Sequence, residues 1–445
     1  MDSSIVIGII IAYIGLLIFI GLYASRKAKS SNGFFLADRS LGRFALTATI
    51  TASAVGGSAT IVAGGRIYAS GLPALWYDIG GALGLIVLGL FLAKKVRKTG
   101  LFTLPDITGK LFDDKTRFAS AILIVITEIA WVSLLIQASS LILSVVVPIN
   151  YEILLVIITV AFVVYTLLGG QYAVVYTDII QFVVMIVGIC IIAAPILFFN
   201  AFSGFDQLTT ATLSFPVNSN IGFMAAGSIF FMMFMPHIVG PDIYSKLLSS
   251  KNVEVARKGA VFSGIFKFIF AAAICVIALS AAVLHPGLEN AYLAIPTAVF
   301  GLSPILSGVI LAGFISVMLS SADTCLLSAG TIISVDIVRN KSVFVSRVGI
   351  LLIGLCALVL AFWLGDVLKT LEVAYTVFTA GLTLPIIFGF YKEKTGVTSL
   401  GAFFSLVFGG GISLVWLFFN SPFVDAILIG LLASLIPLII FRSKD

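Results

Sequence analysis

Long apolar blocks separated by short polar connectors follow one another along the whole chain. Many of these blocks reach the roughly 20 residues that an α-helix needs to cross the hydrocarbon core of a bilayer. The blocks and the helix breakers between them predict thirteen membrane spans, at about 5–23, 44–68, 73–93, 118–147, 152–168, 174–199, 221–245, 258–284, 304–335, 345–365, 370–390, 398–418 and 423–441. No polar stretch between them is long enough for a catalytic or nucleotide-binding domain, so we expect one transmembrane domain over residues 1–445.

The composition excludes a soluble protein. Hydrophobic residues make up 60% of the chain and charged residues only 10%, against roughly a quarter in soluble domains. The sequence therefore predicts an all-α polytopic protein of the cell membrane, whose partner is the lipid bilayer. The net charge of +6 is explained by basic residues that orient membrane spans, so we expect no nucleic-acid partner. The first block, 5–23, lacks the basic leader of a signal peptide and is expected to be retained.

The basic residues test the number of spans. With an external N-terminus and thirteen crossings, all of the 26 lysines and arginines except Arg66 and Lys369 fall on the cytoplasmic side. This asymmetry follows the positive-inside rule, and one span more or fewer would destroy it. We therefore predict an N-out, C-in topology.

Two spans contain helix breakers at matching places. The second span carries Gly56 and Gly57 near its middle, and the seventh carries Pro236 followed by Gly240 and Pro241. Five spans separate them, so they run in opposite directions, as in an inverted repeat of spans 2–6 (about 44–199) and 7–11 (about 221–390). Interrupted helices in matching positions indicate the substrate site of a secondary transporter. The alternative is that the glycines only let helices pack closely.

Motifs for other chemistry are missing from the sequence. There is no Gly-x-x-x-x-Gly-Lys-Ser/Thr loop to bind ATP. Two histidines and four scattered cysteines do not have the spacing of a metal site or a disulfide framework. We therefore do not expect an enzyme.

Ionisable residues within spans are costly and are functional candidates by default. Glu128, Asp178 and Asp323 belong to this group, and Asp78 lies nearer the outer end of its span. Three others are expected only at the cytoplasmic boundaries of the membrane: Asp242, Lys267 and Asp336. For Asp178, two roles are open: its carboxylate is stabilised by the N-terminus of its helix, or it binds a cation.

Two adjacent serines, Ser320 and Ser321, lie in the middle of the ninth span. Membrane serines often bond back to the carbonyl four residues earlier. Paired hydroxyls also suit a hard cation, and carbonyls freed at a helix break, such as those of Ala52 and Val55, would complete its ligands.

Several motifs together resemble the sodium:solute symporter family. They are Phe35-Leu36-Ala37-Asp38-Arg39-Ser40-Leu41-Gly42, the run Tyr165-Thr166-Leu167-Leu168-Gly169-Gly170 with Tyr176-Thr177-Asp178-Ile179-Ile180-Gln181, Pro236-His237-Ile238, and residues 318–327. One departure is Gln171, where the family usually has an apolar residue. The resemblance covers nearly the whole chain. It implies the five-plus-five inverted-repeat fold of the leucine-transporter type, with span 1 and spans 12–13 peripheral, and symport of Na+ with a small solute.

Residue by residue, the resemblance implies two cation sites and a pocket. The main sodium site would use the carbonyls of Ala52, Val55 and Val317 with the hydroxyls of Ser320 and Ser321. Some members have a second sodium site, which here would use Asp178 with the same serines. The number of sodium ions transported with each solute, one or two, therefore remains open. The solute pocket would comprise Ala54, Gly56, Ser58, Ala59, Asp78, Trp131, Ser228 and Met232, and Glu128, Pro236 and Asp323 would take part in gating or coupling.

The predicted pocket favours an amine-bearing solute. No basic residue is expected to face it, whereas Asp78, Glu128 and Trp131 suit an ammonium group through charge and cation–π contact. We therefore expect an amino acid such as proline, or an amine such as choline. Two alternatives are a proton-coupled carrier that uses the buried carboxylates and a membrane sensor with little transport. Sensors of this family carry a cytoplasmic signalling domain, and none follows the last span here. No obligatory protein partner is expected.

Overall fold

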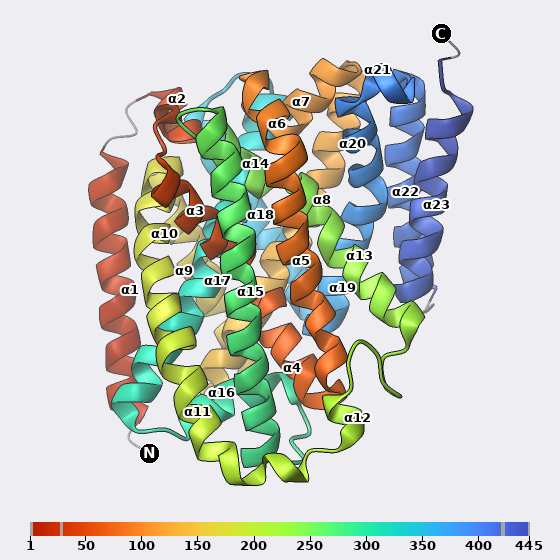
Figure 1. Cartoon of the computed structure of the whole chain (residues 1–445). Coiled ribbons are helices and arrows are strands. Elements are labelled where there is room, and N and C mark those ends of the chain that lie inside the picture. The colour runs from red at the N-terminus through yellow and green to blue at the C-terminus, as the bar shows by residue number, and fades with distance from the viewer. Residues whose placement is uncertain (1–2, 27–29, 420–422, 444–445) are drawn as a thin grey trace.

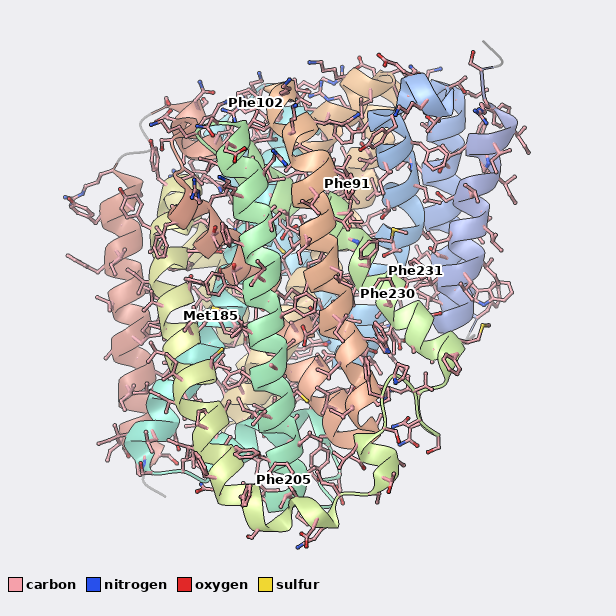
Figure 2. All side chains as sticks on the ribbon, viewed as in Figure 1. Phe91, Phe102, Met185, Phe205, Phe230 and Phe231 are labelled. Atoms are coloured by element: carbon pink, nitrogen blue, oxygen red, sulfur yellow. The ribbon has the colours of Figure 1, made fainter. Side chains whose placement is uncertain are left out.

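The structure of the protein, a computed structural model, describes residues 3–26, 30–419 and 423–443. Within these ranges the regular structure is helical, apart from two isolated β-bridges. Figure 1 shows the helices side by side, most of them running between two opposite ends of the molecule. Large apolar side chains such as Phe91 and Phe231 are exposed on the outside, whereas Met185 is buried (Figure 2). An apolar exterior of this kind fits contact with lipid.

Among the described residues, eleven helical segments are long and apolar enough to cross a membrane. A twelfth candidate is a bent pair, α3 (Arg43–Ala54) and the Gly57–Ser70 segment that contains α4 (Ile61–Ser70). The continuous segments contain α1 (Ser3–Ser25), α5 (Trp76–Val87) with α6 (Ala93–Thr99), α8 (Asp114–Ser144), α9 (Tyr151–Gly169), α10 (Gln171–Met185) with α11 (Ala194–Ala201), α13 (Phe223–Val239) with α14 (Pro241–Leu248), α15 (Val253–Leu284), α17 (Pro304–Ile332), α18 (Val343–Leu364), α19 (Val367–Phe378) with α20 (Leu384–Phe390), and α22 (Ser399–Phe418).

These twelve candidates coincide with the first twelve spans predicted from the sequence. The thirteenth prediction corresponds to α23 (Phe423–Ile440), which packs along α22. Its apolar part with described side chains, Ala426–Ile440, is shorter than the other candidates. The remaining helices are short: α2 (Ser31–Leu36), α7 (Leu104–Leu111), α12 (Thr210–Leu213), α16 (Ala294–Phe300) and α21 (Lys392–Thr395).

Polar capping residues set where several long helices begin. The side chain of Asp113 accepts a hydrogen bond from the Thr116 amide at the start of α8, and Asn252 does the same for Val255 at the start of α15. Such caps satisfy amides that have no partner within the helix. These caps therefore fix the residue at which each polar connector ends and the apolar helix begins.

The bent pair of α3 and α4 and the continuous segment of α13 and α14 run in opposite directions through the fold. In Figure 1, α3 lies nearer the upper end and α4 nearer the lower end, whereas the chain rises from α13 to α14. Helix α17 lies against both regions and is the most buried of the candidate spans, with 83% of its apolar window inside the protein. Helix α1 lies at one edge of the molecule, and α22 and α23 lie at the opposite edge. The breaks are therefore internal features.

Candidate functional site: two broken helices around a cavity

The break after α3 is sharp and glycine-dependent. The axes of the two halves differ by 69°, and the residues between them include Gly56 and Gly57. A β-carbon on Gly56 would lie 2.8 Å from the Oγ of Ser321, and one on Gly57 would lie 3.2 Å from the β-carbon of Ala138. The glycines therefore allow the broken backbone to approach α17 and α8 closely. The seventh predicted span is not broken in the same way. Helix α13 continues through Pro236 to Val239, only Gly240 separates it from α14, which begins at Pro241, and the two helices form one continuous span.

The end of α3 presents carbonyl groups to α17. The Ser321 hydroxyl donates to the carbonyl of Ser53 at 2.9 Å and to that of Val317 at 3.0 Å. The last carbonyls of a helix have no intrahelical partner. Within the described residues, no hydrogen bond to the carbonyl of Ala52 or Val55 is found. Hard, oxygen-rich groups from two helices therefore meet at one buried place.

Asp178 is buried within a second group of oxygens. Its Oδ1 accepts a hydrogen bond of 2.5 Å from Ser320, and its Oδ2 accepts one from Thr49. The same Oδ2 lies 3.1 Å from the Nζ of Lys246, whose ammonium also donates to the carbonyl of Thr49 at 2.7 Å. The side chains of Asp178 and Lys246 are both fully buried. Because α10 begins at Gln171, Asp178 lies beyond the first turn, so a helix N-terminus does not explain its burial.

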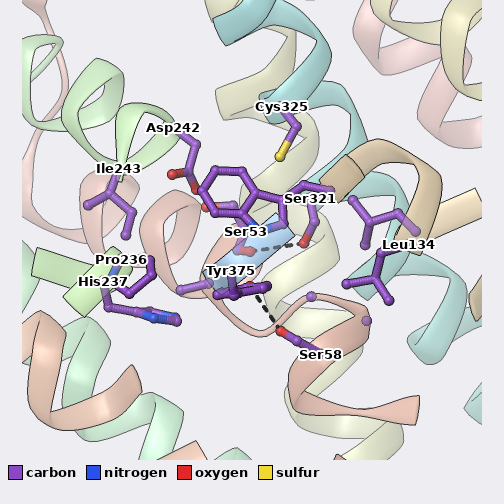
Figure 3. Close-up of a pocket in the computed structure, with 15 residues that line it drawn as sticks. Ser53, Ser58, Leu134, Pro236, His237, Asp242, Ile243, Ser321, Cys325 and Tyr375 are labelled. Atoms are coloured by element: carbon purple, nitrogen blue, oxygen red, sulfur yellow. Dashed lines mark hydrogen bonds between the residues drawn. The ribbon is translucent and has the colours of Figure 1, made fainter. Parts of the chain in front are cut away.

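A cavity lies beside the first of these oxygen groups, because Ser53 and Ser321 line it. Its empty space amounts to about 510 Å³, counting the part that is open to solvent. Figure 3 shows Pro236, His237, Asp242 and Ile243 on one side and Leu134, Ser321 and Cys325 on the other. The remaining lining residues are Ser53, Ala54, Gly56, Gly57, Ser58, Trp131, Leu135 and Tyr375.

Among small and aliphatic residues, the lining contains aromatic rings and one acidic group. The rings of Trp131 and Tyr375 meet edge to face with centroids 5.3 Å apart, and the Tyr375 hydroxyl lies 3.2 Å from the Oγ of Ser58. Asp242, on the first turn of α14, is the one carboxylate among the lining residues, which include no lysine or arginine. Aromatic faces and a carboxylate attract cationic groups.

The structure places only four of the eight residues predicted for the solute pocket around the cavity. Ala54, Gly56, Ser58 and Trp131 line the cavity. The other four are buried outside its lining: Ala59, Asp78, Ser228 and Met232. One oxygen of Asp78 lies 3.4 Å from the Nζ of Lys267, which also donates to the carbonyl of Ala54 at 2.7 Å. The carboxylate of Asp78 is therefore paired within the protein.

The residues predicted for gating are all buried, but only one of them lines the cavity. Pro236 lines the cavity from within α13. Glu128 is completely buried, and neither of its carboxylate oxygens has a hydrogen-bond partner among the described residues. Asp323 is also buried, with Thr324 donating a long 3.3 Å bond to its Oδ1.

Two of the expected boundary residues are deeply buried. Lys267 is fully buried against Asp78, contrary to its expected place at a membrane boundary. Asp336 is also fully buried and accepts hydrogen bonds from Thr103 at 2.7 Å and Arg117 at 2.9 Å. The signal that could have predicted a buried role for Lys267 is its place as a lone lysine inside an otherwise apolar span. Lys246, Thr49 and Tyr375 were missed, because their partners come from distant helices.

A sharply broken helix, buried oxygen clusters and a cavity beside them define a polytopic secondary transporter. The chain belongs to the sodium:solute symporter family, whose model matches residues 34–409. It is a multi-pass membrane protein and a sodium-coupled solute symporter, not an enzyme. The resemblance seen in the sequence is thereby confirmed.

Curated relatives with different solutes cover most of the chain. A sodium/glucose cotransporter of Vibrio parahaemolyticus is 25% identical over 95% of this chain and 87% of its own length. Sodium/proline symporter 2 of Staphylococcus saprophyticus is 23% identical over 93% of this chain and 86% of its own. A high-affinity choline transporter of Drosophila melanogaster is 31% identical over 41% of this chain and 30% of its own.

Solved structures agree on the fold. A substrate-bound, outward-open Na+-coupled sialic acid symporter superposes with a TM-score of 0.82 at 18% identity, over 98% of this chain and 97% of its own. MhsT in complex with L-phenylalanine superposes with a TM-score of 0.62 at 13% identity, over 90% of this chain and 98% of its own. These likenesses establish a fold of the leucine-transporter type.

Proposed function

We propose that this symporter imports a small amine-bearing solute, such as proline or another amino acid, together with Na+ by alternating access. The observation that carries the proposal is the lining of the cavity, where Asp242 and the Trp131–Tyr375 pair occur without any lysine or arginine. An ammonium group would pair with the carboxylate and lie against the aromatic faces. A purely anionic solute would meet no compensating positive side chain there.

The other end of the solute would meet backbone. Gly56 and Gly57 line the cavity at the break, where no β-carbon covers the main chain. Amides at a broken helix suit a carboxylate, so a zwitterionic amino acid fits both ends of the cavity. Ala54 and Ser58 complete this side of the proposed pocket, and Asp242 takes the role that the sequence suggested for Asp78.

For the main sodium ion, we propose the carbonyls of Ala52, Val55 and Val317 with the hydroxyls of Ser320 and Ser321. The bond from Ser321 to Ser53 supports this assignment, because it holds α17 against the end of α3. Ser53 and Ser321 also line the cavity, so the proposed sodium and solute sites share a wall. Such a shared wall lets the binding of one ligand favour the state that binds the other.

The proposed topology has thirteen crossings, an external N-terminus and a cytoplasmic C-terminus, with α23 as the last crossing. Spans 2–6 and 7–11 would form two inverted repeats, with span 1 and spans 12–13 outside them. The opposite directions of the bent pair α3–α4 and of α13–α14 support this arrangement. Pro236 lies within α13 and lines the cavity, and the side chains of Glu128 and Asp323 are buried in α8 and α17.

Uptake into proteoliposomes tests the function. Labelled proline, other amino acids, choline, a sugar, sialic acid and acetate are offered with and without an inward sodium gradient. We expect sodium-driven uptake of an amine-bearing solute, lost in Ser320→Ala and Ser321→Ala. Ser140→Ala is a matched control, since that buried hydroxyl bonds back to Ile136 within α8.

Two outcomes would change the proposal. Uptake of an anion or a neutral sugar, with no amine transported, would contradict the assigned solute class. Uptake driven by a proton gradient and insensitive to both serine variants would instead favour proton coupling through Glu128, whose unpartnered carboxylate is the specific observation behind that second function.

A further inference from the structure

The ammonium of Lys246 occupies a place where the sequence suggested a second sodium ion. Its Nζ lies 3.1 Å from Asp178 Oδ2 and donates to the carbonyl of Thr49 at 2.7 Å. Lys246 belongs to α14, Asp178 to α10 and Thr49 to α3, so three helices meet at one buried charge. Both charged side chains are fully shielded from solvent.

The oxygens around this ammonium are those that a hard cation prefers. A carboxylate, a main-chain carbonyl and nearby hydroxyls are typical ligands of small cations in proteins. Here the carboxylate already has three donors, because Ser320 bonds to Oδ1 while Thr49 and Lys246 both bond to Oδ2. A sodium ion beside Asp178 would have to displace the lysine and would then leave the ammonium buried without a partner, which is strongly unfavourable.

The proposed main sodium site contrasts with this arrangement. Two lysines reach carbonyls of α3 within the described residues: Lys246 at Thr49 and Lys267 at Ala54. Neither donates to the carbonyls of Ala52 or Val55. One oxygen group thus contains a cation fixed to the protein, whereas in the other group neither lysine occupies the carbonyls of Ala52 and Val55.

We infer that Lys246 is a built-in replacement for a second sodium ion and that the symporter couples one Na+ to each solute. The ammonium supplies the same single positive charge to Asp178, but the backbone tethers it, so it cannot be released with the solute. This inference rests on the proposed sodium symport and deepens it by fixing the number of ions.

Equilibrium binding of 22Na+ to the purified full-length protein tests this inference without requiring the solute. We expect about one ion per wild-type chain at saturation and about two in Lys246→Gln, which vacates the oxygens around Asp178. The double variant Asp178→Asn/Lys246→Gln, which removes both charges, should return to one. Lys251→Gln is the control, because Lys251 is exposed and its amide bonds only to the Leu41 carbonyl.

The outcomes separate this inference from the proposed function. Two ions bound to the wild type would overturn the inference and leave sodium symport intact. No ion bound to a folded, monodisperse wild type would instead remove the proposed sodium coupling. A Lys246→Gln protein that elutes as folded and still binds one ion would also overturn the inference. If Lys246→Gln aggregates, the number of sodium ions bound by the wild type and by the double variant tests the inference instead. Two bound ions in either protein would overturn the inference.

Discussion

Gly56 and Ser321 face each other so closely that a single methyl group does not fit between them. The β-carbon that Gly56 lacks would lie 2.8 Å from the Ser321 Oγ and 3.3 Å from its β-carbon. Ser321 has little freedom to move aside, because its hydroxyl is bonded to Ser53 and Val317. The break in one helix and the hydroxyl of another are therefore fitted together.

Gly56→Ala should weaken sodium binding more than it weakens folding. The added methyl would push the Ser321 hydroxyl away from the end of α3, and a loss of about 1.4 kcal/mol would reduce sodium affinity about tenfold. The sodium dependence of uptake gives the affinity. Gly227→Ala is the control, because a β-carbon there meets nothing within 4 Å. Equal sodium affinities in the two variants would contradict the proposed site.

Sodium itself should stabilise the protein. A ligand that binds only the folded state adds about 2.7 kcal/mol when its concentration is 100 times its dissociation constant. Thermal unfolding in detergent should therefore shift upward in NaCl relative to KCl of equal ionic strength. The shift should disappear in Ser321→Ala and persist in Ser140→Ala. Equal stabilisation by K+ would show an ionic-strength effect and not a sodium site.

Tyr375→Phe should lower the affinity for solute without changing that for sodium. The substitution removes the hydroxyl that bonds to Ser58 but keeps the ring against Trp131. Loss of one hydrogen bond, about 1 kcal/mol, corresponds to a few-fold weaker solute affinity. Uptake measured at varied solute concentration, and separately at varied sodium concentration, distinguishes the affinity for solute from the affinity for sodium. Tyr172→Phe serves as control, since its hydroxyl bonds to Asp38 at an exposed position.

Lys267→Met should destabilise the fold strongly. It would leave the carboxylate of Asp78 buried without its partner, and breaking a buried ion pair from one side costs about 3–5 kcal/mol. The double variant Lys267→Met/Asp78→Leu should recover part of that loss, because neither charge then remains. Thermal unfolding measures both. Lys258→Met, which removes an exposed partner of Glu254, should leave the unfolding temperature unchanged.

The sequence predicted the membrane spans well because their signals are local. Apolar length and the position of breakers located twelve segments, including the break at Gly56 and Gly57 and the one at Gly240. Bilayer thickness imposes this length on each helix separately, so no tertiary information is required. The close apposition of Ser321 to the end of α3 could not be derived from periodicity and was suggested by family resemblance.

The charge partners could not be predicted in the same way. The seventh span was predicted to end at residue 245, whereas α14 continues to Leu248, so Lys246 was assigned to a cytoplasmic loop. Its partner Asp178 lies on a different helix, 68 residues away in the sequence. Asp78 was likewise expected to contact solute, because nothing local indicates that Lys267 neutralises it. Pairings between distant helices depend on packing, which a single sequence does not display.

Lys267 also constrains the mechanics of the transport cycle. Its ammonium joins the end of α3 to Asp78 on α5, so α3, α5 and α15 are fastened together by charged bonds away from water. Those helices are expected to move as one rigid body. The bond from Ser321 to Ser53 instead joins α3 to α17 through one neutral hydroxyl. Asp178 adds an indirect link, because it accepts hydrogen bonds from Thr49 on α3 and from Ser320 on α17. Movement of α3 against α17 therefore has to break contacts along the wall where the proposed sodium ion would bind.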